Sequence, residues 1–348
     1  MLDEQTSPSD SYTSHSELLA GYFTVTVPIG SRVKIHTGLR SERSLVSLDS
    51  YKADATNPPS AEDEIHYLSD TILFLPAVNI SFSMTEKSLL RLAYGQTVNR
   101  PEYREIAPMS FYDYEMKAVI TGNDSLTFAT IHNFDFRYEY YPNPFSMFSL
   151  GAFHKQFINA IEYQIIPTGS GLQYSFQNTP EASVSGLEAE MRLTAASLKG
   201  FDFLRNFTVI FNAAVIKSRI CFNENSLEKD RALQGQSPFI LNASLFYQND
   251  SLGLNAGLMY NVAGKRISFV GDPFTGNPHI YEMPSNQLDL SLSKKLGSRI
   301  ELKAQVRNLF NSKTEYRQTV ETESGKASQT TMHYKPGRYY LLGLIWKI

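Results

Sequence analysis

Six side chains in residues 97–126 are the candidates for ligand contact. Two arginines offer rigid hydrogen-bond donors to an anion, and four aromatic rings offer stacking faces. A polar ligand site commonly combines such groups. The predicted ligand contacts are Arg100, Tyr103, Arg104, Phe111, Tyr112 and Tyr114. The alternative is a structural loop that packs on itself, and residues 218–237 and 264–284 are equally plausible ligand contacts.

Catalytic motifs are sparse. The segment Gly169-Ser170-Gly171 lacks the third glycine of a dinucleotide loop, and the sequence has no phosphate loop, GxSxG, HExxH or CxxC motif. Glu188 and Glu190 point the same way on a strand, which imitates a carboxylate pair, but solvation of a wet surface explains them more simply. We therefore predict no enzymatic activity and no cofactor.

Two histidines are candidate metal ligands. If the turn at 141–145 is centred on Asn143, His132 and His154 lie directly opposite each other on adjacent strands. Both then share the apolar face with Phe134 and Leu150. That position suits an amphipathic ring at a membrane interface better than a metal ligand, so we predict no metal site.

Composition excludes some classes of protein but does not identify the fold. The 348 residues are 42% hydrophobic and carry a net charge of -3, which gives no reason to expect nucleic-acid binding. The mean hydropathy is -0.26. The apolar stretch 71–84 contains Pro76 and is too short for a membrane helix. The single cysteine, Cys221, excludes an internal disulfide.

Strict alternation of apolar and polar residues predicts the fold. In residues 133–140, Phe134, Phe136, Tyr138 and Tyr140 alternate with charged and amide side chains, and residues 300–307 behave likewise. About thirteen such segments occur, without a helical period long enough to cover a sheet. The predicted strands are 17–27, 31–50, 71–84, 88–96, 127–141, 145–160, 180–194, 203–217, 238–248, 253–263, 285–294, 299–311 and 337–348.

The connections between these strands alternate between very short and long. Tight turns are expected near 28–30, 85–87, 142–144, 195–200, 249–252 and 296–298. Long loops are expected at 51–70, 97–126, 159–179, 218–237, 264–284 and 312–335. This segregation is typical of an antiparallel transmembrane β-barrel meander, with short turns on one side of the membrane and long loops on the other.

The amino-terminal end does not suit a complete barrel. Residues 1–16 are polar and acidic without a secretory signal, so we expect them to belong to an outer loop, with 17–348 forming the carboxyl-terminal portion of a barrel. An odd strand count would place the two termini on opposite sides, whereas single-chain bacterial barrels have even counts. We expect a partial barrel; one miscounted strand is the alternative.

Several stretches resemble the barrel of TonB-dependent receptors, particularly the Bacteroidota type. They are 38–42 (GLRSE), 92–108 (LAYGQTVNRPEYREIAP), 122–126 (GNDSL) before 131–135, 186–190 (GLEAE) and 306–311 (VRNLFN). The resemblance implies a 22-stranded barrel in the bacterial outer membrane that imports a scarce small nutrient. It also implies energy coupling to the TonB complex through a plug and TonB box that these residues do not contain. Asp124 and Phe128 stand where the family often has proline.

The last strand carries a separate signal. Its apolar face resembles the signal that the barrel-assembly machinery reads, and comprises Tyr340, Leu342, Leu344, Trp346 and Ile348. Its other face is apolar too, so a strand buried on both sides in a soluble sheet is the alternative.

The sequence is compatible with three classes of function. The preferred one is a TonB-dependent receptor that imports a siderophore, haem, glycan or peptide. A passive pore or small complete barrel is the second, and an outer-membrane enzyme is the third. The expected partners are outer-membrane lipid, the barrel-assembly machinery and the nutrient.

Overall fold

The computed structural model describes residues 7–52, 58–114, 118–168, 171–195, 204–222, 230–271, 278–322 and 325–347. Within them, thirteen strands follow one another in a single antiparallel path. The path consists of β1 (Thr13–Ile29), β2 (Val33–Tyr51), β3 (Glu64–Thr85), β4 (Ser88–Asn99), β7 (Ala129–Asn143), β8 (Ser146–Thr168), β9 (Gly171–Thr194), β10 (Phe207–Cys221), β11 (Phe239–Asn249), β12 (Leu254–Ala263), β15 (Asn286–Leu296), β16 (Ile300–Arg307) and β19 (Tyr339–Trp346).

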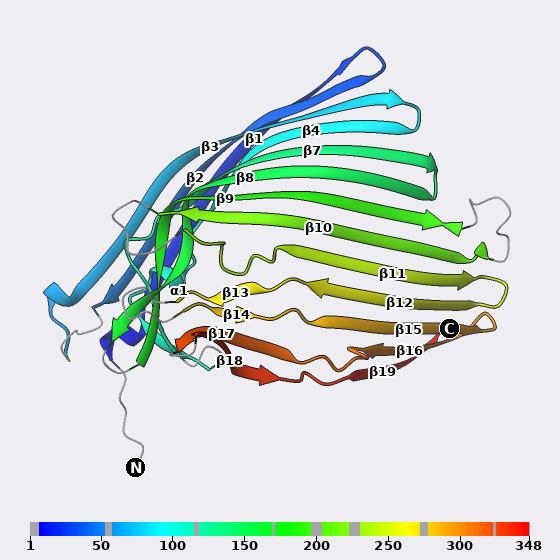
Figure 1. Cartoon of the computed structure of the whole chain (residues 1–348). Helices are drawn as coiled ribbons and strands as arrows, with labels where there is room; N and C mark the ends of the chain where they lie inside the picture. The colour runs from blue at the N-terminus through cyan, green and yellow to red at the C-terminus, as the bar shows by residue number, and fades with distance from the viewer. Residues whose placement is uncertain are drawn as a thin grey trace.

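The sheet is curved and open, with β1 and β19 at its two edges (Figure 1). The predicted all-β meander is therefore confirmed. The helical elements that lie wholly within the described residues are α1 (Tyr103–Ile106) and the 3-10 turns η1 (Pro8–Asp10) and η2 (Ala61–Asp63). None of these described helices is long and apolar enough to cross a membrane.

The short turns gather at one end of the strands and the long connections at the other, as Figure 1 shows. Gly30 and Gly297 adopt φ values of 61° and 68° in two of the tight turns. A residue without a Cβ atom takes this left-handed conformation at little cost. The predicted segregation of turn lengths is thus confirmed for the described turns. The tight turn predicted at 195–200 falls almost entirely outside the described residues.

The long connections, which were predicted as loops, contain further strands. β8 and β9 pair from Met147 with Arg192 to Thr168 with Gly171, so the segment 159–179 is a hairpin extension. The other connections contain β5 (Ser110–Asp113) with β6 (Ala118–Thr121), and a second sheet of β13 (Arg266–Phe269), β14 (Ile280–Glu282), β17 (Thr314–Thr322) and β18 (Gly325–Tyr334). Backbone polar groups need partners, and these pairings supply them. β1 also begins four residues earlier than expected, at Thr13.

The buried apolar clusters lie at the end that carries these insertions. One contains Ile120, Leu126, Tyr174 and Phe176. Rings connect the hairpin extension to the second sheet, because Tyr174 lies 6.3 Å from Phe269 and Phe269 lies 6.1 Å from Tyr316 between centroids. Aromatic contacts at these separations stabilise packing. The long connections therefore form a packed outer rim.

Candidate functional site: the inner wall and the outer rim

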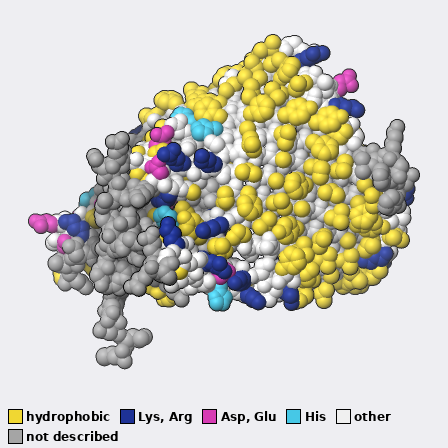
Figure 2. All heavy atoms as spheres, in the orientation of Figure 1, with side chains coloured by type: hydrophobic (Ala, Val, Ile, Leu, Met, Phe, Trp, Pro, Cys, Tyr) yellow, Lys and Arg dark blue, Asp and Glu magenta, His cyan; other side chains and the backbone are white. Residues whose placement is uncertain are grey.

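Each strand of the meander has an apolar face and a polar face. Register places Leu92, Phe136, Ala152, Leu187 and Val215 in one row across β4, β7, β8, β9 and β10. These residues form the apolar face, and Figure 2 shows the hydrophobic surface that such side chains cover. Phe134 and Leu302 on that face are 46% and 43% exposed. Neither is sealed in a core, as the alternation predicts.

The polar face carries a chain of ion pairs across β4, β7 and β9. Arg91 Nε lies 3.2 Å from Glu139 Oε1, and Arg137 Nε lies 3.1 Å from the same oxygen. Arg137 also contacts Glu190 at 2.7 Å. Alternation identified these strands, but the cross-strand network was missed because it depends on register, which no single strand encodes.

The six predicted ligand residues lie in one insertion. Several of them contact other protein side chains, so those groups are already occupied. Arg100 donates to Glu42 Oε2 over 2.6 Å, and the Arg104 guanidinium lies 4.6 Å from the Phe111 ring centroid. Tyr112 and Tyr114 form an edge-to-face pair with centroids 5.1 Å apart. Tyr114 is 84% exposed and Tyr103 is partly exposed at 37%. Their role in ligand contact stays a prediction.

The helix between these residues anchors the insertion. Ile106 and Ala107 are buried together with Leu48 of β2. Glu105 on the same turn accepts a hydrogen bond from the Glu102 backbone N–H over 2.8 Å, while burial raises the pKa of its carboxyl. Gly122 allows a close approach, because a Cβ atom there would lie 1.9 Å from the Ala107 carbonyl oxygen. The segment is thus fitted closely to the meander.

A cleft of about 860 Å³ opens between the rim ends of β4 and β7, the part of β8 at 157–163, and the second sheet. Two ion pairs line or adjoin it. Arg231 lies 2.7 Å from buried Glu162, and Arg266 lies 2.7 Å from Glu282. Sequence reasoning missed this cleft because it arises only when the β8–β9 extension and the second sheet fold over the rim. Its mixed charge suits hydrogen bonding to a polar molecule.

The predicted opposition of His132 and His154 is wrong. His132 pairs with Gln156, and His154 pairs with Phe134. Asn143 pairs with Ser146, so the turn is centred beyond Asn143. After the irregularity between Tyr140 and Asn143, the partner strand is displaced by two positions from the expectation. The two rings occupy separate contacts, with His132 Nδ1 3.0 Å from Tyr94 Oη and His154 Nδ1 2.8 Å from Ser185 Oγ.

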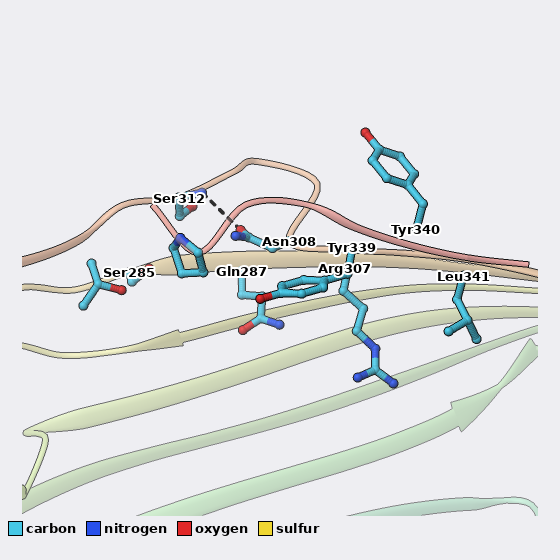
Figure 3. Close-up of a pocket in the computed structure, with 10 residues that line it drawn as sticks. Ser285, Gln287, Arg307, Asn308, Ser312, Tyr339, Tyr340 and Leu341 are labelled. Atoms are coloured by element: carbon cyan, nitrogen blue, oxygen red, sulfur yellow. Dashed lines mark hydrogen bonds between the residues drawn. The ribbon is translucent and has the colours of Figure 1, made fainter. Parts of the chain in front are cut away.

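The 306–311 motif makes the turn that leaves β16. Asn308 has φ 54°, its backbone N–H donates to Asp289 Oδ1 over 2.8 Å, and its side-chain amide donates to the Gly337 carbonyl over 2.8 Å. Its own Oδ1 accepts from the Ser312 N–H over 3.1 Å, the dashed line in Figure 3. Asn308 thereby fastens β15, β16 and the approach to β19. Its role is structural.

The last strand exposes its predicted assembly face. Tyr340, Leu342, Leu344 and Trp346 are between 66% and 87% exposed, and Ile348 lies outside the described residues. They stand opposite Val306, Ala304, Leu302 and Ile300. Figure 3 shows Tyr340 pointing to the opposite side of the sheet from Arg307 and Leu341. Leu341 on the other face is also 63% exposed, so the strand is not buried on both sides.

Solved structures share this fold at low sequence identity. The copper transporter OprC matches with a TM-score of 0.68 and 17% identity, over 96% of this chain and 48% of that one. The ferric-catecholate import receptor Fiu from K12 E. coli matches with a TM-score of 0.65 and 13% identity, over 96% of this chain and 45% of that one. The ferric enterobactin receptor PfeA from Pseudomonas aeruginosa matches with a TM-score of 0.60 and 17% identity, over 96% of this chain and 54% of that one. This chain therefore spans about half the length of these receptors.

No match was found among curated proteins. The family model described as "TonB dependent receptor-like, beta-barrel" matches residues 2–309. That match covers most of the meander, including β1 to β16. The chain belongs to the TonB-dependent receptor β-barrel family, whose members are bacterial outer-membrane proteins.

Proposed function

We propose that this chain forms the carboxyl-terminal part of the wall of an energised outer-membrane transporter for a scarce small nutrient. The observation that carries the proposal is the two-faced meander, whose apolar face suits lipid and whose charged face suits a hydrated conduit. Family membership supports energised uptake rather than passive diffusion. Energy would reach the conduit through a plug and TonB box supplied from outside these residues.

The rim would supply the first contacts with the nutrient. Tyr103, Tyr112 and Tyr114 present exposed rings, and the neighbouring cleft offers paired charges and amides. The solved neighbours are named for ferric siderophores and copper, so a metal complex is one candidate cargo. Haem, a glycan or a peptide are the others. An enzymatic role is the least favoured alternative, because those neighbours are transporters and receptors.

The apolar edge strand β19 supports two further partners of the proposed transporter. Its exposed face of Tyr340, Leu342, Leu344 and Trp346 would meet outer-membrane lipid. The same face would be read by the barrel-assembly machinery during insertion.

The test is uptake by the native host with and without the gene, under limitation for each candidate nutrient. We expect the deletion strain to lose accumulation of one labelled nutrient, and an uncoupler of the inner-membrane proton gradient to abolish the same uptake in the parent strain. Uptake that persists with the uncoupler, at the unperturbed rate, would identify a passive pore. Unchanged uptake of every nutrient in the deletion strain would contradict both transport functions.

A further inference from the structure

The apolar face of β8, β9 and β10 changes character abruptly within four residues. One register row reads Ala152, Leu187 and Val215, with Leu187 and Val215 65% and 67% exposed. The next row toward the rim reads His154, Ser185 and Lys217. The row beyond it reads Gln156, Ser183 and Arg219. Hydrocarbon-compatible side chains therefore give way to hydrogen-bond donors on the same outward face.

The height of this border fits the edge of a bilayer. His154 lies nine residues beyond Phe145 in the β7–β8 turn. A tilted transmembrane strand crosses the hydrocarbon core in about 9–11 residues. The border therefore falls where the outer leaflet's headgroups begin, and Figure 2 shows Lys, Arg and His side chains along one margin of the hydrophobic surface.

The three side chains of the first polar row form a contiguous donor set. His154 Nδ1 lies 2.8 Å from Ser185 Oγ, which leaves the other ring nitrogen available for a ligand. Lys217 stands directly opposite Ser185, is exposed, and has no ion-pair partner among the described residues. Adjacent strands lie about 4.8 Å apart, so the backbones that carry His154 and Lys217 lie about 10 Å apart on either side of Ser185, a spacing that a bound phosphate can bridge.

Two acidic groups limit the charge of this patch. Arg219 forms an ion pair with Asp230, and Glu181 accepts a hydrogen bond from Gln156 over 2.9 Å. Both carboxylates lie toward the rim from the row that contains Lys217. Lys217 is therefore the cation nearest the apolar border, and it remains free to meet an anionic headgroup.

We propose that His154, Ser185 and Lys217 bind the phosphate groups of a glycolipid in the outer leaflet. The occupant is identified by charge complementarity and by the apolar row below it, which would hold the lipid's acyl chains. Basic residues near an anionic membrane surface attract its headgroups. The site would hold the outer rim at a fixed height and is separate from the conduit.

The test uses the full-length receptor in nanodiscs that contain either phosphorylated lipid A or the same lipid enzymatically dephosphorylated. The measured quantity is the dissociation constant of labelled lipid A, with Lys217→Gln as the variant. The matched control is Lys155→Gln, which removes the same charge from the opposite face of β8. Lys217→Arg tests whether a cation alone suffices.

We expect Lys217→Gln to weaken binding of phosphorylated lipid A about fivefold, the effect of about one charge at a membrane surface. The Lys155→Gln and Lys217→Arg variants should bind as the parent does, and dephosphorylated lipid should not distinguish any of them. Equal binding by Lys217→Gln and the parent would overturn the proposal. Inorganic phosphate that binds the parent as tightly as lipid A would also overturn it, by showing a site for soluble anions.

Discussion

At the scale of single residues, one buried carboxylate connects the meander to the 97–126 insertion. Glu42 of β2 receives Arg40 Nε at 2.5 Å and the Arg100 guanidinium at 2.6 Å. Its side chain is only 8% exposed, while those of Arg40 and Arg100 are 41% and 28% exposed. A nearly buried carboxylate with two cationic partners stabilises the fold more than an ion pair on the surface does. Arg100 is therefore held at the point where the chain leaves β4.

Replacing Glu42 with Ala should loosen the insertion that follows Arg100. Loss of the shared acceptor leaves a partly buried guanidinium without its partner, at a cost of about 1–3 kcal/mol. We expect faster hydrogen exchange of the backbone amides in 100–126, with little change in β11 and β12. Glu86→Ala, in the exposed β3–β4 turn, is the matched control. Equal protection of the insertion in Glu42→Ala and the parent would show that the pairs do not anchor it.

At the scale of elements, the transmembrane part of the fold was predictable from sequence and the rim was not. Period-two alternation around Phe134 and Leu302 identified strands, because lipid on one side and water on the other impose opposite polarity on successive residues. Rim strands such as β13 and β14 are three or four residues long and packed by other insertions. Their pattern is too short to distinguish from a loop.

The candidate site was predictable only to the level of a segment. The run from Arg100 to Tyr114 could be marked out as a candidate from its residue types, but Arg100 pairs with Glu42, 58 residues away in sequence. Glu162 and Arg231 are 69 residues apart in the sequence, and they meet only in the folded rim. Contacts of this kind are fixed by strand register and by tertiary packing, which local patterns do not encode.

A close contact on the polar face of β8 and β9 gives a test of element packing. Phe153 stands directly opposite Gly186, and a Cβ atom at Gly186 would lie 2.5 Å from the Phe153 ring. Gly186→Val should therefore lower the yield of folded barrel, measured by its heat-modifiable mobility in gels, because the ring must leave its position.

The double variant Gly186→Val with Phe153→Ala tests the cause of that defect. Removing the ring creates space for the new methyl groups, so the yield should recover toward that of Phe153→Ala alone. If Gly186→Val lowers the yield equally with and without the Phe153 ring, the loss is caused by the strand backbone and not by this contact.

The β17–β18 hairpin should lose stability in acid. Hydrogen bonds from Lys313, Arg317 and Thr330 lower the pKa of the Glu315 carboxyl from 4.5 to about 2. A carboxyl whose pKa is lower in the folded state than in the unfolded state stabilises the fold at pH values above its unfolded pKa. This stabilisation is lost as the pH falls through the folded-state pKa of about 2. Hydrogen exchange of the hairpin amides, corrected for intrinsic rates, should be slower in the parent than in Glu315→Gln at pH 6. That difference should shrink steadily toward pH 2, and a constant difference would rule out the carboxylate as its cause.

At the scale of the whole molecule, the two faces of the meander have different tasks. Apolar side chains occupy the same face of the successive strands from β4 to β19, among them Leu92, Leu187, Leu258, Leu290 and Leu342. The opposite face carries the ion pairs of Arg91, Arg137 and Glu190. A bilayer outside and water inside account for both faces together.

Spin labels on successive residues of β7 provide the most direct measurement of this arrangement. In a Cys221→Ser background, residues 134 to 138 would be replaced by cysteine one at a time in the full-length receptor, labelled, and placed in bilayers. We predict that labels at Phe134, Phe136 and Tyr138 collide mainly with lipid-soluble oxygen, while those at Asp135 and Arg137 collide mainly with an aqueous nickel chelate. Accessibility without this two-residue period, or aqueous accessibility at Phe136, would contradict the account.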